Sequence, residues 1–350
     1  MRGRPVSGDE QAFVRSAVGS HGPDPRRPVF PAKIQAVTPA LSGAHSRPFG
    51  EVGRGCRAAP GPVVHHGGVA EVAEGGTRTG LAVLADLVSD GDVVVLSGAG
   101  LSTESGIPDY RGETGRRRRA DPMTYQAFTG SEAARRRYWA RSHLGWRHMA
   151  RARPNAGHRA VAELQRRGLL AGVITQNVDG LQQAAGARDV IELHGALDRV
   201  VCLSCGDRSP RERLDERLHE ANPGWTARAE TINPDGDAVL GDEAVAAFRT
   251  VDCERCGGAL KPDVVFFGEN VPPPRVAECY ALTERAGALL VLGSSLTVLS
   301  GYRFVRHAAR HGVPVAIVNR GATRGDPHAL VTLDAPLGAT LGALVAELPA

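Results

Sequence analysis

One stretch of the chain reads Val93-Val94-Val95-Leu96-Ser97-Gly98-Ala99-Gly100, a short apolar run followed by small residues. Four consecutive aliphatic residues are typical of a strand buried on both faces of a parallel sheet. Glycines directly after such a strand allow a backbone to approach a phosphate closely. The stretch therefore predicts the first strand of an α/β domain with an anion-binding loop at its carboxyl end.

Further apolar runs of similar length predict four more parallel strands: Gly172–Thr175, Val190–Leu193, Ala288–Leu292 and Val313–Val318. Each run is followed by small or polar residues: Gln176-Asn177-Val178-Asp179, His194-Gly195, Gly293-Ser294-Ser295 and Asn319-Arg320-Gly321. In an open parallel sheet, ligands bind in the crevice at the carboxyl ends of the strands. Five such endings indicate one ligand site along this edge.

Helical patterns accompany the strands. Residues 81–88 precede the first strand, and Asn155 is a plausible N-cap for a helix that ends near Gly168. The predicted fold class is α/β, a Rossmann-like doubly wound parallel sheet with an inserted zinc-binding module. We expect a disordered extension over 1–77, the first part of the sheet domain over 78–199 with a helical segment at 120–150, the zinc module over 200–260, and the second part over 261–350.

The glycine loop departs from the dehydrogenase fingerprint. A third glycine is missing, Pro108 breaks the helix that should follow, and the segment some 20 residues on is Arg116–Arg119. An acidic residue is expected there to hold the ribose hydroxyls. Simple hydride transfer is therefore disfavoured. The arginine run is interpreted either as a solvated loop or as a contact for cofactor phosphates or an acidic partner.

Four of the six cysteines form two C-x-x-C pairs, Cys202 with Cys205 and Cys253 with Cys256. This spacing is typical of two clamps on one tetrahedral Zn²⁺, and the alternative is four buried thiols. Four thiolates leave no open coordination position, so the zinc is predicted to be structural. The pairs are separated by 47 residues, which requires an insert that loops out.

Charge and hydropathy exclude several classes of protein. No apolar run is long enough to span a membrane. Residues 1–70 hold nine basic and four acidic side chains, so the rest of a chain of net charge +4 carries −1. A near-neutral body argues against direct nucleic-acid binding. The paired cysteines and the absence of a secretory signal favour the cytoplasm, although the Arg-rich, Gly- and Pro-rich N-terminus also suits a transit peptide or an upstream start codon.

Two further features have a structural and a functional interpretation. His194 is either a hydrogen-bonded structural histidine or a general base at the same edge as Asn177 and Asp179. The run Val264–Glu269 is either an ordinary core strand or, through its two aromatic residues before a glycine, the wall of an apolar channel.

Together these segments resemble the sirtuin family over about residues 78–340. The strongest block reads Gly98-Ala99-Gly100-Leu101-Ser102-Thr103-Glu104-Ser105-Gly106-Ile107-Pro108-Asp109-Tyr110-Arg111 and is similar to the sirtuin cofactor loop almost residue for residue. The other blocks follow in the family's order: 175–179, 193–195, the cysteine pairs, 261–269 and 293–295. Three segments resemble class II, the sirtuin-4-like branch of the family. They are the sequence of residues 103–111, the segment Arg137–Arg141 and the long insert that contains Asn233–Asp237.

The resemblance implies a role for each of these segments. NAD would contact Gly98–Gly100, Ser102, Thr103, Pro108–Arg111, Gln176–Asp179, Gly293–Ser295 and Asn319–Gly321, with Leu337 near the adenine. Asn177 and Asp179 would orient the nicotinamide ribose, and His194 would be the base. An acyl-lysine peptide would add as a strand beside the substrate-binding residues Val265, Phe266, Phe267, Gly268 and Glu269.

The implied activity is that of an NAD-dependent protein-lysine deacylase. Nicotinamide leaves, the acyl group passes to ADP-ribose, and lysine and O-acyl-ADP-ribose are released. Two alternatives stay open: a protein mono-ADP-ribosyltransferase on the same fold, and a non-catalytic zinc module that binds protein or nucleic acid. The stretch after Arg111 lacks the usual Gly-aliphatic-aromatic element and a Tyr-x-x-Arg pair, so desuccinylation is not predicted.

Overall fold

The computed structural model describes residues 74–110, 122–227, 236–238 and 240–349. The extension predicted for residues 1–77 lies outside the described residues except at its end, where helix α1 (Glu74–Ser89) already begins. Arg111 and the run Arg116–Arg119 also lie outside them. Within the described residues, no helix is long and apolar enough to cross a membrane.

The larger sheet has six parallel strands in the order β3-β2-β1-β7-β8-β9. Their bounds are β1 (Val93–Ser97), β2 (Leu170–Thr175), β3 (Val190–Glu192), β7 (Ala288–Leu292), β8 (Val315–Asn319) and β9 (Val331–Asp334). The chain builds outward from β1 to β3, then returns to β7 and builds the other way. This order is that of a doubly wound dinucleotide-binding sheet, whose ligand crevice lies where the strand order reverses, between β1 and β7.

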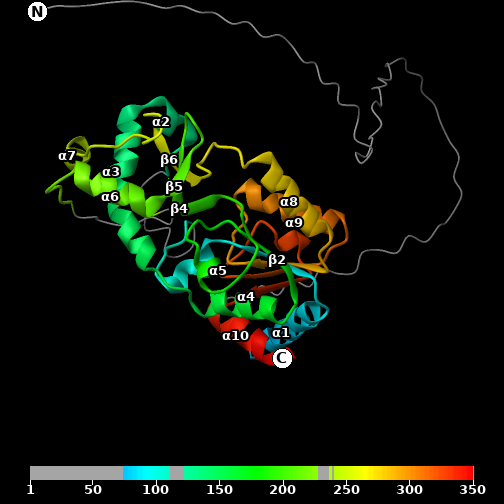
Figure 1. The fold of residues 1–350 in the computed structure, drawn as a ribbon. Coiled ribbons are helices and arrows are strands. Elements are labelled where there is room, and N and C mark those ends of the chain that lie inside the picture. The colour runs from blue at the N-terminus through cyan, green and yellow to red at the C-terminus, as the bar shows by residue number, and fades with distance from the viewer. Residues whose placement is uncertain (1–73, 111–121, 228–235, 239, 350) are drawn as a thin grey trace, which may run out of the picture. The chain divides into compact units, whose positions relative to one another are not determined.

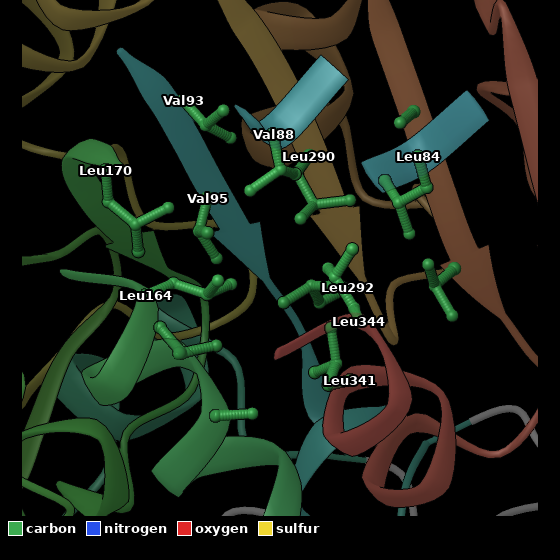
Figure 2. Close-up of a cluster of buried hydrophobic side chains, with 14 of the residues drawn as sticks. Leu84, Val88, Val93, Val95, Leu164, Leu170, Leu290, Leu292, Leu341 and Leu344 are labelled. Carbon is green, nitrogen blue, oxygen red and sulfur yellow. The ribbon is translucent and has the colours of Figure 1, made fainter. Parts of the chain in front are cut away.

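Helices cover both faces of this sheet (Figure 1). One face carries α1, α4 (Ala156–Arg166) and α10 (Leu337–Glu347), and the other carries α8 (Pro273–Glu284) and α9 (Leu299–Arg310). Alternate residues of β1 therefore enter two cores: Val93 and Val95 pack with the first layer, and Val94 and Leu96 with the second. Figure 2 shows Val93 and Val95 among leucines from α1, α4 and α10. A strand buried on both sides explains the unbroken apolar run.

A smaller antiparallel sheet has the order β5-β4-β6. It consists of β4 (Gly195–Cys202), β5 (Arg208–Pro210) and β6 (Leu260–Val264), and it packs with the helices α2 (Tyr125–Gly130), α3 (Glu132–Arg151), α6 (Arg211–Ala221) and α7 (Asp242–Ala246). Short elements complete the described chain: η1 (Ala99–Ser105), α5 (Leu181–Ala184) and η2 (Asp326–His328).

The division of the chain differs from the sequence-based one in two respects. The expected boundary at residues 199 and 200 falls inside β4, because the cysteines lie at the far end of this strand and not at its start. The helical segment at 120–150, expected in the sheet domain, shares its core with the smaller sheet, where Phe128, Tyr138 and Trp139 pack around Val200.

Asn155 connects helix α4 to the loop after β1. Its side-chain oxygen accepts hydrogen bonds from the N–H groups of Gly157 and His158, which confirms the predicted N-cap. Its Nδ2 donates to the carbonyl of Leu101 at 2.7 Å and to the hydroxyl of Ser105 at 3.0 Å. The same buried amide thus begins a helix and holds the loop that follows the first strand.

We predict that Asn155→Ala lowers the free energy of unfolding by about 2 kcal/mol, because it removes the cap and leaves the Leu101 carbonyl without its donor. Ser131→Ala is the matched control, since Ser131 caps α3 through one exposed hydrogen bond from Ala134 and should cost at most about 1 kcal/mol. Urea unfolding measures both. Equal losses in the two variants would contradict the second function of Asn155.

Candidate active site and metal centre

A cavity of about 520 Å³ lies at the carboxyl edge of the larger sheet. The ends of five strands line it (β1, β2, β3, β7 and β8), together with the segment after β6 and the start of α9. Most of the predicted cofactor contacts reach it: Gly98, Ala99, Gly100, Ser102, Asp109, Tyr110, Gln176, Asn177, Val178, Asp179, Gly293, Ser294, Ser295, Asn319, Arg320 and Gly321. The edge predicted from the strand endings is therefore a real crevice.

Ser102 joins the two predicted ribose-binding residues. Its hydroxyl donates to Asp179 Oδ2 at 2.6 Å and accepts from Asn177 Nδ2 at 3.1 Å. Asn177 Nδ2 also donates to the carbonyl of Gly98 at 3.0 Å. Burial raises the pKa of Asp179, while hydrogen bonds from Ser102 and from the Leu181 N–H oppose that shift. This network fixes an amide and a carboxyl group against the glycine loop.

His194 follows β3 and turns into the same cavity. Its Nδ1 lies 2.9 Å from the carbonyl of Gln176, and its Nε2 lies 2.7 Å from the hydroxyl of Ser300. A carbonyl can only accept, so Nδ1 carries the proton and donates it, and Nε2 presents its lone pair to the Ser300 hydroxyl. The hydrogen bonds thus select the tautomer that a general base at Nε2 needs.

Burial keeps this imidazole neutral. It lowers the pKa of His194 from 6.5 to about 4; Arg275 and Arg303 act in the same direction, and the bond to Gln176 opposes it. The base form is therefore present throughout the neutral pH range. Among the described residues that line the cavity, His194 is the only histidine. Hydrogen bonds hold both of its ring nitrogens, and Nε2 is unprotonated.

The glycines at the strand ends allow the two central loops to approach each other. A Cβ on Gly100 would lie 2.8 Å from the Gly293 carbonyl oxygen, and a Cβ on Gly293 would lie 2.4 Å from the backbone nitrogen of Leu101. Gly293 also has a φ of +63°, which favours glycine. The glycines were predicted to admit a phosphate; in addition, packing between β1 and β7 requires them.

The segment Val265–Glu269 lines the cavity but is not a strand, because β6 ends at Val264. Its two aromatic residues separate: Phe266 is buried in the core of the smaller sheet, and Phe267 is 37% exposed. Glu269 holds the turn, since its carboxylate accepts from the Phe266 N–H at 2.8 Å and pairs with Lys261 at 3.0 Å. The channel-wall interpretation thus agrees with the structure, and the core-strand interpretation is wrong.

The four paired cysteines converge on one point. Their sulfur atoms all lie within 4.8 Å of one another. Two contacts join the pairs: the sulfur atoms of Cys202 and Cys256 lie 3.5 Å apart, and those of Cys205 and Cys253 lie 3.8 Å apart. Zn–S bonds of about 2.3 Å in a tetrahedron place sulfur atoms about 3.8 Å apart. The four thiols therefore fit a structural Zn²⁺.

The pKa values of the thiols also favour binding of a cation among them. Burial opposes ionisation of Cys202, but hydrogen bonds from the backbone of Cys205 and Ser204 outweigh it and lower the pKa of this thiol to about 6. Its neighbours raise the pKa of Cys256 to about 12. Full ionisation of all four sulfurs needs a positive charge among them, which a divalent metal supplies.

Comparison with known proteins agrees with this geometry. Residues 98–300 match the model of the Sir2 family. An "NAD-dependent protein deacetylase 1" from Streptomyces coelicolor is 66% identical over 263 residues, which are 75% of this chain and 88% of the relative. The protein of the same name from Mycobacterium avium is 55% identical over 261 residues, 73% of this chain and 91% of the relative.

The chain belongs to the Sir2 family, the sirtuins. Solved Sir2 structures share its fold. A complex described as Sir2–p53 peptide–NAD+ is 29% identical, with a TM-score of 0.62, and the match covers 76% of this chain and 98% of the other. Sir2 bound to acetylated peptide is 28% identical with a TM-score of 0.61, over 76% and 98% of the two chains.

Some expected contacts of this Sir2 chain do not reach the cavity. Thr103 lies inside η1, where its hydroxyl donates to the Gly100 carbonyl. Pro108 is buried beside the cavity, and Leu337 packs in the core of the larger sheet at the start of α10. None of these three is among the lining residues, and their cofactor role stays a prediction.

Sequence reasoning also missed residues that do line the cavity. Ser300 is the clearest case, because it contacts His194 although 106 positions separate them. Arg303, one turn further along α9, lines the cavity as well. A single serine before Gly301 carries no local signal, so only the packing of α9 against the end of β3 could identify it.

We predict that Cys253→Ser lowers the zinc content toward zero and destabilises the chain by several kcal/mol, part of the roughly 10–16 kcal/mol that structural zinc contributes to small zinc domains. Cys279→Ala is the control, because this buried cysteine of α8 lies outside the cluster and its loss should leave zinc in place. Metal analysis and thermal melting measure the effect. Full zinc content in Cys253→Ser would refute the assignment.

Proposed function

We propose that this Sir2 chain is an NAD-dependent protein-lysine deacylase that releases nicotinamide and transfers the acyl group to ADP-ribose. The observation that carries the proposal is the neutral His194, which lines the cavity together with the Asn177–Ser102–Asp179 network and whose Nε2 accepts from Ser300. Relatives named NAD-dependent protein deacetylases support the proposal.

The cavity has the donors and acceptors that NAD needs. The N–H and hydroxyl groups at the ends of β1 and β7 suit phosphates, and the amide and carboxyl group of Asn177 and Asp179 suit ribose hydroxyls. When bound, NAD supplies an electrophilic ribose carbon and a leaving group. Asn177 and Asp179 would hold the ribose ring, because Ser102 hydrogen-bonds both side chains and so fixes them to the loop after β1.

His194 acts after nicotinamide has left. With NAD and acyl-lysine bound, its Nε2 would take the proton of a ribose hydroxyl as the hydroxyl oxygen attacks the acyl carbon, and the Gln176 carbonyl would stabilise the resulting imidazolium through Nδ1–H. Ser300 must give up its hydrogen bond to Nε2 when the ribose hydroxyl arrives. Burial that lowers the pKa of His194 also makes it release this proton readily.

We propose that the acyl-lysine peptide lies between Val265–Glu269 and residues 296–299. Both segments line the cavity, and Ser300, which follows the second segment, contacts His194 Nε2. The Val265 N–H already donates to the His194 carbonyl at 2.8 Å, which aligns the first segment with the base. An extended peptide can add to such a segment through main-chain hydrogen bonds.

The placement of His194 favours deacylation over mono-ADP-ribosylation. Transfer of ADP-ribose to a protein nucleophile needs attack at the ribose carbon but no base at a ribose hydroxyl. Mass spectrometry separates the reactions, because deacylation shortens the substrate and ADP-ribosylation adds a large fixed mass. Loss of the acyl group with formation of O-acyl-ADP-ribose is expected.

We also propose membership of class II, the sirtuin-4-like branch. Two class II-like blocks meet in space: Arg141 pairs with Asp237 at 3.1 Å and donates to the Ala238 carbonyl at 2.6 Å. A Cβ on Gly145 would lie 1.6 Å from the Gly236 carbonyl oxygen, so helix α3 and the insert fit only with glycine there. Asn233–Asp235 lie outside the described residues.

We also propose that the protein acts in the cytoplasm. The four clustered cysteines form no disulfide, as is usual in a reducing compartment.

We predict that His194→Ala slows deacylation by at least about 10²–10⁴-fold, the loss typical of a general base. Exchange of labelled nicotinamide into NAD needs only the earlier step and should be retained much better, whereas Asn177→Ala should depress both reactions. All rates are compared at saturating NAD and acyl peptide. The pKa of His194 in the enzyme without substrate is about 4. We therefore expect kcat/KM to fall only as the pH approaches 4, where the imidazole becomes protonated and can no longer act as a base. Equal loss of exchange and deacylation in His194→Ala would show that His194 acts in the first step.

We predict that Ser300→Ala slows deacylation by up to about 10²-fold, the cost of misplacing a catalytic group. KM for the peptide and nicotinamide exchange should change little, because Ser300 acts only by holding Nε2 in place until the ribose hydroxyl replaces it there. Ser300→Thr keeps the hydroxyl and should restore most of the rate. If Ser300→Thr were as slow as Ser300→Ala, the hydroxyl would not be the cause.

A further inference from the structure

Three metal-binding side chains meet at the ends of two helices, apart from the cavity and the four cysteines. Glu284 is the last residue of α8, His307 lies in the last turn of α9, and His311 follows α9 directly. One donor atom from each lies within 4.8 Å of the other two. The histidines are four positions apart, so both rings lie on one face of the helix end.

Hydrogen bonds orient the two rings. His311 Nδ1 lies 2.9 Å from the His307 carbonyl, so it carries the proton and leaves the Nε2 lone pair free to bind. Metal-binding histidines commonly donate their second nitrogen in this way. The His307 ring packs on Tyr280, with centroids 4.6 Å apart, and its Nε2 lies 2.8 Å from Glu284 Oε1.

The surroundings favour a cation at this position. The carboxyl ends of α8 and α9 both lie here, and unpaired carbonyls give a helix end partial negative charge. The Glu284 carboxylate adds a full negative charge, against which the neighbouring Arg285 and Arg310 act. The His307–Glu284 hydrogen bond brings two of the three groups together, and the His311 ring, whose centroid lies 4.1 Å from that of His307, adds a third possible ligand.

We propose that Glu284, His307 and His311 form a second metal site, for a divalent ion such as Zn²⁺ that binds imidazole and carboxylate together. Bonds of about 2.0–2.2 Å need donor atoms about 3–4 Å apart, which small rotations of the exposed Glu284 and His311 side chains provide. Three protein ligands leave a position for water. The ion joins the end of α8 to the end of α9, whose first turn holds Ser300 against His194.

The test uses the full chain without an affinity tag, with one zinc per chain in the four-cysteine centre as checked by metal analysis. Equilibrium dialysis against added ZnCl₂ then measures further binding. His311→Ala should weaken the second zinc at least about tenfold, and Glu284→Gln should also weaken it. His219→Ala is the matched control, because this exposed histidine of α6 has no histidine or acidic partner in a metal cluster of the described chain.

Residues 1–73 contribute His21, His45, His65 and His66, so the difference between wild type and each variant is what counts. Added zinc should raise the melting midpoint of wild type and of His219→Ala more than that of His311→Ala. Melting without added zinc checks that the variants fold. If His311→Ala folds poorly, Glu284→Gln gives the answer. Binding unchanged in every folded variant of the cluster would overturn the proposal.

Discussion

The close contact between the ends of β1 and β7 is the constraint on which the rest of the site depends. The Gly100 N–H donates to the Gly293 carbonyl at 2.8 Å, a distance that side chains at either position would prevent. The contact lies where the strand order reverses, so it sets the spacing of the two loops that open the crevice. This spacing sets the positions of Ser102 after β1 and Ser294 after β7, and both contact residues that follow β2. Ser102 donates to Asp179, and Ser294 accepts from Gln176.

Burial then determines the chemistry. The sheet is covered on both faces, so groups at its carboxyl edge are partly withdrawn from water. The same desolvation lowers the pKa of His194 and raises that of Asp179, and both shifts favour the neutral form of the side chain. Because Nδ1 of the neutral His194 donates to the Gln176 carbonyl, Nε2 can only accept a proton. The fold thus prepares the base before any substrate binds.

The sequence predicted the parts of the structure that depend on local patterns. Five apolar runs became parallel strands, and Asn155 and Gly168 limit a helix, because burial and capping leave a mark on neighbouring residues. Strand β9 was not predicted because Val331–Asp334 is short and lies at the sheet edge, where only Leu333 is buried. The paired cysteines predicted their own convergence, since the spacing of metal ligands is also local.

Contacts between distant segments could not be predicted in this way. Ser300 meets His194, and helices α2 and α3 join a core whose strands begin more than 40 residues later, only because of tertiary packing. The resemblance to sirtuins supplied roles for residues that periodicity could not assign, yet Thr103 and Leu337 show its limit. A family motif carries residues that support the loop as well as residues that line the cavity.

Lys261, in β6 of the smaller sheet, helps to position the segment that lines the cavity of the larger sheet. It is buried in β6, its ammonium group lies 4.6 Å from the centroid of Phe266, and it pairs with Glu269 while donating to the Val264 carbonyl. Burial lowers the pKa of Lys261, and Glu269 opposes the shift. A buried ion pair is costly unless its hydrogen bonds are satisfied, as they are here. The pair therefore contributes position more than stability: it fixes the turn that carries Phe267 to the cavity, while the Val265 N–H binds the carbonyl of His194. The base and the proposed substrate wall are thus held by one continuous set of contacts.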